Sequence, residues 1–407
     1  MYGQGRYCTS DERFTGTPVF TEGEVDASMG VSYGIAKNYK DQEENLILNI
    51  YYPKMSVDTM TKRPLVVLVH GGGFVGGSLN GLNDYCMNFA QRGYVAATVE
   101  YRLGWDKAPE PCEGDPISQQ EAFYRSLQDV HAAVRYLVNN ADTYKIDTGW
   151  IFAGGTSAGA FTTTNLAFFQ QSEVDSMLPY LRASLGSING SGNTLTDTFR
   201  IKGLFHNWGS VFNLGIITIS DAIPLIGFAG DRDAISPIDS GYWQGCTDFH
   251  IMYGTRAIHE RLKDVGICSE LNVKVDGGHG VWKDTPEQNI FRIERACCFF
   301  KSIFCKACSS VGNYDSIPAA CGALNNNNSV GQNETSEIGI YPNPFTDRLN
   351  ITIEESNLSF RLINSIGREV WIGDRLGGRD FSGLIPGIYY LEIVRNGNIE
   401  VNKLIKI

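Results

Sequence analysis

Ser157 stands in the pentapeptide Gly155-Thr156-Ser157-Ala158-Gly159, which follows the apolar run Trp150-Ile151-Phe152-Ala153 and opens a helix-compatible stretch. In this strand–turn–helix setting the pattern G-x-S-x-G is typical of a nucleophile elbow, in which a tight turn lifts the serine hydroxyl out of the backbone. A serine hydroxyl is a poor nucleophile at neutral pH and needs a base beside it. Because Gly, Ser and Ala are common residues, the pattern alone is weak, and the rest of the chain has to supply the partners.

A second glycine-rich segment, His70-Gly71-Gly72-Gly73-Phe74, comes directly after the apolar run Leu65-Val66-Val67-Leu68-Val69. The oxyanion formed when a serine attacks a carbonyl needs backbone N–H donors, and consecutive glycines let the main chain approach it closely. A flexible turn is the simpler interpretation, but the position at a strand end upstream of a G-x-S-x-G favours an oxyanion hole. We therefore expect Gly72, Gly73 and Ala158 to donate their amides to the oxyanion.

An acidic partner is expected in the segment Phe228-Ala229-Gly230-Asp231-Arg232-Asp233, which ends another apolar strand-like run. A carboxylate at the carboxyl end of a strand can orient an imidazole and stabilise its cationic form. Asp231 and Asp233 compete for this role, and a solvated loop carboxylate is the simpler interpretation of either. Asp233 is preferred because the acid in this kind of loop usually lies three residues after the glycine.

The base must be one of six histidines, at positions 70, 131, 206, 250, 259 and 279. His279 is the preferred candidate because glycines flank it in Asp276-Gly277-Gly278-His279-Gly280, directly after the last strand-like run of the sheet. Such a loop leaves the ring free to face Ser157, although an ordinary loop histidine is the alternative. His70 is expected to shape the glycine loop rather than to act as the base.

These residues need a scaffold that brings strand ends together, and the chain alternates strand-like and helix-like stretches from about residue 30 to 306. Between residues 119 and 141, apolar side chains recur at steps of 4, 3, 4 and 3, as on one face of a helix. The strand-like runs include residues 46–52, 65–69, 94–99, 150–153, 225–229 and 271–275. This alternation predicts an α/β fold, a mostly parallel sheet flanked by helices.

The composition changes after this region. Residues 309–336 are polar and low in complexity, with a run of four asparagines at 325–328, and are interpreted as an Asn/Ser-rich linker. Residues 337–407 carry short strand-like runs between Gly-rich turns, which is typical of a small all-β sandwich. We therefore expect a catalytic domain over residues 1–308, a linker over 309–336 and a β-sandwich domain over 337–407.

The overall composition excludes several classes of protein. The chain has 407 residues, of which 43% are hydrophobic and 19% charged, so it can bury a sizeable core. Its formal net charge is −11, and no basic stripe appears, which argues against nucleic acid as a partner. No apolar run approaches the roughly 18 residues that a membrane helix needs, so we expect no membrane span.

Ten cysteines are present, an even number that is high for a cytosolic enzyme. We interpret them as structural disulfides formed in an oxidising compartment, with the connectivity left open. Cys305-Lys306-Ala307-Cys308 also has the C-x-x-C spacing of a zinc or redox site, but no histidine pair or thioredoxin-like context accompanies it. The printed start, Met1-Tyr2-Gly3-Gln4, has no charged-then-apolar segment, as expected of a mature chain whose signal peptide is missing.

Together, the motifs at 70–74, 155–159, 230–233 and 278–280 resemble those of α/β-hydrolase carboxylesterases with an H-G-G-G oxyanion loop. The resemblance covers roughly residues 30–306 and extends to hormone-sensitive-lipase-like enzymes and to bacterial feruloyl and acetyl-xylan esterases. It implies an α/β-hydrolase fold with the family's Ser…Asp…His chain order, here Ser157, Asp233 and His279. It also implies ester hydrolysis through an acyl-enzyme, with no metal and no organic cofactor.

The resemblance leaves the ester open. For an extracellular esterase with an aromatic-lined pocket, feruloyl or acetyl esters of plant polysaccharide are one candidate substrate class and synthetic polyesters are another, and the sequence does not choose between them. Phe74 and Trp208 are candidate substrate-binding residues, and a packed core tryptophan is an equally good interpretation of Trp208; Tyr242-Trp243 and Trp282 are weaker candidates. A serine peptidase of the same fold is one alternative function, and a hydrolase-fold binding or adhesion protein is another.

The C-terminal segment resembles a type A sorting domain of the type IX secretion system. The resemblance spans nearly all of residues 337–407 and rests on four motifs: Ile340-Tyr341-Pro342-Asn343-Pro344-Phe345, Ser365-Ile366-Gly367-Arg368-Glu369-Val370, Pro386-Gly387-Ile388-Tyr389-Tyr390 and Lys403-Leu404-Ile405-Lys406. It implies export across the outer membrane by the type IX machinery and a secreted or cell-surface location. A carbohydrate-binding sandwich is the alternative.

Overall fold

A computed structural model describes residues 6–9, 12–110, 112–315, 321, 340–351, 358–364, 369–395 and 398–407. The chain divides into two compact units, Met1–Leu324 and Asn325–Ile407, and each is described by itself. No helix among the described residues is long and apolar enough to cross a membrane.

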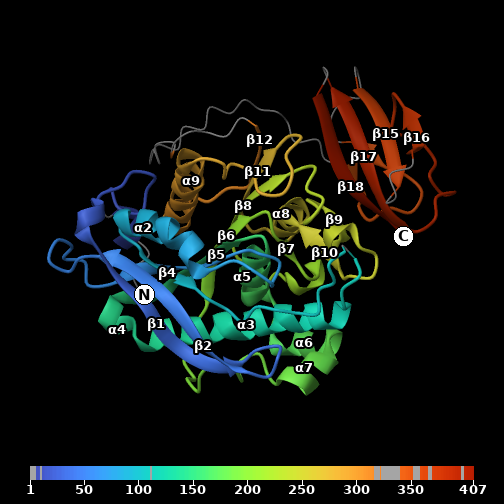
Figure 1. Ribbon diagram of the computed structural model, residues 1–407. Helices are drawn as coiled ribbons and strands as arrows, with labels where there is room; N and C mark the ends of the chain where they lie inside the picture. Colours follow the sequence, from blue (N-terminus) through green and yellow to red (C-terminus); the bar gives the residue numbers. More distant parts are fainter. Residues whose placement is uncertain are drawn as a thin grey trace. The chain divides into compact units, whose positions relative to one another are not determined.

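The first unit is built on a nine-stranded sheet, as far as the described residues show (Figure 1). Its first two strands in sheet order are antiparallel to their neighbours, and the strands from the third onward run parallel to one another. In sheet order these strands are β1 (Val25–Lys37), β2 (Glu43–Pro53), β4 (Val95–Val99), β3 (Arg63–Val69), β5 (Ile146–Thr156), β6 (Ile201–Asn207), β8 (Leu225–Gly230), β11 (Ser269–Lys274) and β12 (Val311–Tyr314). The predicted α/β class with a mostly parallel sheet is confirmed.

Helices cover both faces of this sheet. The helices are α1 (Arg6–Thr9), α2 (Asn83–Gln91), α3 (Pro116–Asn139), α4 (Ala141–Tyr144), α5 (Ala158–Phe168), α6 (Gln171–Met177), α7 (Pro179–Leu185), α8 (Thr255–Asp264) and α9 (Pro286–Phe304). The sequence sets the start of the long helix α3. Pro116 occupies its first turn, and the Asp115 carboxylate caps it by accepting hydrogen bonds from the Ile117 and Ser118 amides.

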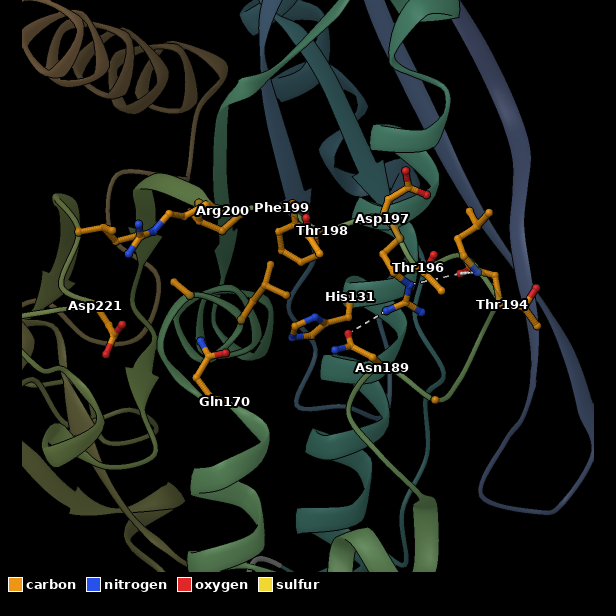
Figure 2. A pocket seen from close by; sticks show the side chains of 18 residues that line it. His131, Gln170, Asn189, Thr194, Thr196, Asp197, Thr198, Phe199, Arg200 and Asp221 are labelled. Carbon is orange, nitrogen blue, oxygen red and sulfur yellow. Dashed lines mark hydrogen bonds between the residues drawn. The ribbon is translucent and has the colours of Figure 1, made fainter. Parts of the chain in front are cut away.

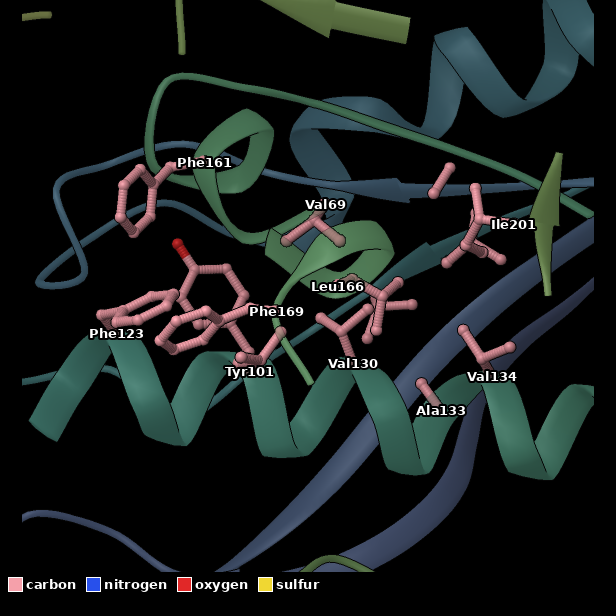
Figure 3. Packing of buried hydrophobic residues seen from close by; sticks show 14 of the residues in the cluster. Val69, Tyr101, Phe123, Val130, Ala133, Val134, Phe161, Leu166, Phe169 and Ile201 are labelled. Carbon is pink, nitrogen blue, oxygen red and sulfur yellow. The ribbon is translucent and has the colours of Figure 1, made fainter. Parts of the chain in front are cut away.

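Burial on both faces explains why the central strands are continuously apolar. In β3, Leu65, Val67 and Val69 belong to the cluster that includes side chains of α3, α5 and α8. Figure 3 shows Val69 of this cluster together with Val130 of α3 and Leu166 of α5. The alternate residues Val66 and Leu68 belong to the opposite cluster, with side chains of α2 and α9. Successive side chains of a strand point to opposite faces of the sheet. When both faces are covered, every side chain of the strand is buried, and the strand is apolar almost throughout.

A smaller sheet of β7 (Ser210–Val211), β10 (Ile251–Gly254) and β9 (Ser240–Tyr242) completes the described strands of the first unit. The second unit contains small antiparallel β-sheets. One is the pair β13 (Ile340–Tyr341) and β14 (Asn350–Ile351); the other has the order β16 (Glu369–Gly373), β15 (Leu358–Asn364), β17 (Gly387–Arg395) and β18 (Asn398–Lys406). Phe345, Leu362 and Leu391 are among the buried residues of their core.

The linker prediction needs a correction at its beginning. Residues 311–314 form β12, which pairs in parallel with β11, and Cys321 is bonded to Cys298 of α9. The interval predicted as linker therefore still belongs to the first unit at these positions. Residues 316–320 and 322–339, and the motif positions 365–368, lie outside the described residues.

Disulfides tie distant parts of the first unit together. The bonded pairs are Cys8–Cys305, Cys112–Cys246, Cys268–Cys308 and Cys298–Cys321. Cys305 and Cys308 thus belong to two different disulfides and do not act as a metal-binding pair. Cys86 and Cys297 are reduced and buried, and burial raises the pKa of both thiols.

Candidate active site

Ser157 lies at the sharp turn between β5 and α5, in the left-handed backbone region with φ of 53°. The glycines around it are required by close packing. A Cβ on Gly155 would lie 2.5 Å from the Val69 carbonyl oxygen, and a Cβ on Gly159 would lie 2.0 Å from the same atom. Helix α5 therefore starts directly against the end of β3, and the strained turn holds the serine hydroxyl clear of the backbone.

Three side chains from separate loops meet at this turn. The Ser157 Oγ atom is 2.8 Å from His279 Nε2, and His279 Nδ1 is 2.7 Å from an Asp233 carboxylate oxygen. His279 follows β11 and Asp233 follows β8, so adjacent parallel strands deliver both groups to the same sheet edge. Ser157 and His279 are 122 positions apart in the sequence, and only the fold brings them into contact.

The hydrogen bonds of the Asp233 carboxylate determine which ring nitrogen of His279 carries the proton. The second carboxylate oxygen of Asp233 accepts the backbone N–H groups of Ile235 at 2.8 Å and Ser236 at 2.9 Å, and the Asp233 side chain is fully buried. An ionised carboxylate can only accept, so His279 Nδ1 carries the proton and His279 Nε2 accepts from Ser157. Of the two competing carboxylates, Asp233 rather than Asp231 contacts the imidazole.

A cavity of about 710 Å³ opens on this group. Gly72, Gly73 and Ala158 line it together with Ser157 and His279. Their three amides donate to no acceptor among the described residues, so the N–H groups are available to a ligand. The loop geometry requires glycine, because Gly72 has φ of 119° and a Cβ there would lie 2.0 Å from the Gly76 carbonyl oxygen.

His70 supports the glycine loop from behind. Its ring stacks on Tyr101 at 4.5 Å, its Nδ1 lies 2.7 Å from the Gly71 carbonyl oxygen and its Nε2 lies 2.9 Å from Glu100. Burial acts to raise the pKa of Glu100, but hydrogen bonds from His70 and the Leu79 amide outweigh it and lower that pKa. The expected structural role of His70 agrees with these contacts.

The remaining histidines do not line the cavity at Ser157. His206 is buried and bonded to Thr164, and burial lowers its pKa to about 4. Burial also lowers the pKa of His131 to about 3. His131 lines a larger cavity of about 920 Å³ with residues such as Asn189 and Asp221 (Figure 2), which shares no lining residue with the cavity at Ser157.

Aromatic side chains form part of the wall around Ser157, but not all of the predicted ones. Trp208 and Trp243 line the cavity. Phe74 does not: the residue is 2% exposed, and its ring packs edge-on against Tyr101 and Phe161 in the core. A positive φ of 63° at Phe74 accompanies this inward placement, so the expectation of substrate contact is corrected. Trp282 lines a separate small cavity.

Sequence reasoning missed several lining residues. Lys107, Lys283, Tyr85 and Asn289 all line the cavity at Ser157. No motif marks them, because Tyr85 and Asn289 sit on ordinary helices, α2 and α9, and the lysines on loops. The described residues contain no group of three or more His, Cys, Asp or Glu side chains arranged to hold a metal ion.

Comparison with protein families agrees with this geometry. The BD-FAE family model matches residues 48–201, which include the glycine loop and the nucleophile turn. The model of the secretion system C-terminal sorting domain matches residues 339–407. This sorting domain indicates secretion or cell-surface export, and the disulfides are consistent with an extracellular protein.

Among curated proteins, the chain is similar to neuroligin-like protein glit-1 of Caenorhabditis elegans, with 33% identity over 130 residues, 32% of this chain and 16% of that protein. It is also similar to gut esterase 1 of the same organism, with 31% identity over 144 residues, 35% of this chain and 22% of that protein. The chain thus covers about a fifth of the length of these relatives.

Among solved structures, a propionate-bound esterase from Thermogutta terrifontis has 17% identity and a TM-score of 0.46, covering 72% of this chain and 98% of that one. The strand order, the turn at Ser157 and the two family matches together define the two parts of the molecule. The first unit thus has an α/β-hydrolase fold whose residues 48–201 match the BD-FAE family, and the chain carries a C-terminal sorting domain of the type IX secretion system over residues 339–407.

Proposed function

We propose that the chain is a secreted serine ester hydrolase that works through an acyl-enzyme on Ser157. The observation that supports this best is the continuous series of hydrogen bonds from Ser157 Oγ through His279 to Asp233. Beside it, in the same cavity, lie three backbone N–H groups that donate to no described acceptor. A nucleophile, a base held by a third group, and donors for an oxyanion are the parts that acyl transfer needs.

In the first half of the proposed reaction, His279 Nε2 removes the proton from Ser157 Oγ as Oγ attacks the ester carbonyl carbon. The amides of Gly72, Gly73 and Ala158 stabilise the negative oxygen, and Asp233 stabilises the imidazolium. The carbon–oxygen bond to the alcohol then breaks, and His279 gives its proton to the departing alcohol. An acyl group remains on Ser157.

In the second half, water replaces the alcohol. His279 takes a proton from the water, which attacks the acyl carbon, and the oxyanion forms again beside the same amides. Breaking the bond to Ser157 Oγ returns the proton to serine and releases the carboxylic acid. The chain's own residues carry every proton in this scheme.

We propose feruloyl or acetyl esters as the substrate class, in line with the matched esterase family and with two tryptophans, Trp208 and Trp243, on the cavity wall. Synthetic polyesters are a further candidate of the same chemistry. The C-terminal domain is proposed to engage the type IX secretion machinery and to take no part in catalysis.

The experiment is hydrolysis of a chain-length series of neutral 4-nitrophenyl esters, set beside an aminoacyl 4-nitroanilide. We expect ester hydrolysis, little anilide hydrolysis, and a loss of about 10⁴-fold or more in Ser157→Ala. Ser220→Ala, a change at an exposed serine, is the matched control and should keep full activity. Anilide cleavage in preference to ester cleavage would favour a peptidase, and no turnover of either would favour a binding protein.

A further inference from the structure

The cavity at Ser157 has an unusual charge for this chain. The chain as a whole has a formal net charge of −11, yet no Asp or Glu occurs among the described residues that line the cavity. Two lysines, Lys107 and Lys283, do line it, and neither forms an ion pair with any other described residue. Asp233 does not line the cavity, because its side chain is fully buried and contacts the far side of the His279 ring through Nδ1.

Lys283 lies close to the reacting groups. A Cβ built on Gly280 would lie 2.3 Å from Lys283 Cε and 3.0 Å from Lys283 Nζ, so the ammonium group sits beside the residue that follows His279. Gly280 has φ of 85° and carries no side chain, which leaves the space for the lysine. Lys283 therefore places an ammonium group on the cavity wall, next to the loop that carries His279.

A third cation stands behind the cavity wall on α9. Arg292 is fully buried, and the described acceptors that its guanidinium contacts are neutral: Tyr85 Oη, Asn289 Oδ1 at 2.5 Å, Asn207 Oδ1 at 2.6 Å and the Trp282 carbonyl oxygen at 2.8 Å. The guanidinium also lies 4.7 Å from the ring centre of Trp208. Because no carboxylate balances Arg292, its positive field extends into the adjoining cavity.

These contacts also fix the direction of an amide on the cavity wall. Arg292 is only a donor, and the Tyr85 hydroxyl, which accepts from Arg292, donates to Asn289 Oδ1 at 2.8 Å. The hydrogen bonds from Tyr85 and from Arg292 both end on the oxygen of the Asn289 amide. The NH₂ group of this amide is therefore the part that can donate to a ligand. Asn289 lines the cavity, and its wall therefore offers donors and cations.

We propose that the substrate of this site is an ester that also carries a free carboxylate, held by Lys283, the Asn289 amide and Lys107. This inference rests on the proposed ester hydrolysis and adds the chemical class of the substrate. A carboxylate is the group that matches an amide donor and ammonium cations without other acceptors. The proposal allows the carboxylate to be on the acyl half or on the alcohol half of the ester. Substrates that carry the charge on one half or the other distinguish these two cases.

The test compares kcat/KM within two matched pairs of esters. Monoadipate 4-nitrophenyl ester against 4-nitrophenyl hexanoate places the carboxylate in the acyl half; 4-acetoxybenzoate against 4-acetoxybenzamide places it in the alcohol half. We expect the wild-type protein to prefer the anionic member of at least one pair at low salt. That preference should fall by about 5-fold in Lys283→Gln or Lys107→Gln, reverse in Lys283→Glu, and weaken at about 0.5 M NaCl.

Lys62→Gln removes the same charge at an exposed position outside the cavity and should leave the preference unchanged. Equal or faster turnover of the neutral member in both pairs would overturn the inference while leaving ester hydrolysis intact. A preference that survives both lysine substitutions would overturn it as well. Failure to hydrolyse any of the four esters would count against the proposed function itself.

Discussion

The backbone N–H of Ser157 donates to the carbonyl oxygen of Asn207 at 2.9 Å, which ties the nucleophile turn to the end of β6. The Asn207 side chain strengthens this tie, since its amide donates to the Gly155 carbonyl oxygen at 2.9 Å and its oxygen accepts from Arg292. Asn207 is fully buried. The position of Ser157 thus depends on a residue that has no place in the catalytic motifs.

We predict that Asn207→Ala lowers both stability and turnover. The change removes one hydrogen-bond partner from the buried Arg292 guanidinium and one from the buried Gly155 carbonyl. Each unsatisfied group lowers the unfolding free energy by about 1–3 kcal/mol. Urea unfolding and ester kinetics measure the two effects. Asn139→Ala, at an exposed helix end, is the control; equal stability of the two variants would refute the role of Asn207.

Gly159→Ala is predicted to abolish activity. Its new Cβ would lie 2.0 Å from the Val69 carbonyl oxygen, so α5 must move away from β3 and carry Ser157 out of reach of His279. Gly23→Ala meets no atom within 4 Å and serves as the control. Circular dichroism separates loss of fold from loss of geometry, and normal kinetics in Gly159→Ala would contradict the packing argument.

Glu100 is predicted to stabilise the protein in a pH-dependent way. Although burial opposes it, the bonds from His70 and Leu79 lower the pKa of Glu100 below its usual value of 4.5. A lowered folded-state pKa gives stability that is present above the unfolded pKa and is lost as the pH falls through the folded one. Near neutral pH, Glu100→Gln should therefore have a lower unfolding free energy than the wild-type protein. This difference between the two proteins should shrink as the pH falls below about 4.5.

Denaturant titrations of both proteins at several pH values would measure this difference. A gap between the two curves that stays constant from pH 7 down to about pH 3 would show that Glu100 acts through something other than its charge.

The Cys112–Cys246 disulfide joins two loops that supply cavity residues, Lys107 on one side and Trp243 on the other. We predict that replacing both cysteines by alanine raises KM several-fold, because both loops lose their common anchor. The matched control is the double alanine variant of Cys268 and Cys308, whose bond lies outside the cavity lining. Each loss also lowers stability, by about 2–5 kcal/mol. A KM effect of equal size in both variants would indicate general loosening instead.

Local chemistry made the reacting loops predictable. The turn at Ser157 and the loop at Gly72 need glycines for positive φ or close packing, and such requirements leave a readable sequence pattern. The central strands were predictable because burial on both faces leaves no polar position. His279 could be preferred because glycines flank it at a strand end.

Features that depend on tertiary contacts were not predictable. Arg292 occupies an ordinary position of an amphipathic helix, and its importance appears only when α9 packs against Asn207 and Trp208. Phe74 follows the glycines in sequence, but its backbone turns the ring into the core. Residues 311–314 have a weak strand pattern of their own, and pairing with β11 makes them a strand.

Covalent labelling tests the central claim most directly. After treatment with a fluorophosphonate, intact-mass measurement and peptide mapping should find one adduct, on the peptide that contains Ser157. The adduct should be absent in Ser157→Ala, and in His279→Ala it should form more slowly by about 10³-fold or more, since the base is missing. An unlabelled wild-type protein, or an adduct that persists in Ser157→Ala, would contradict the assignment of Ser157 as the nucleophile.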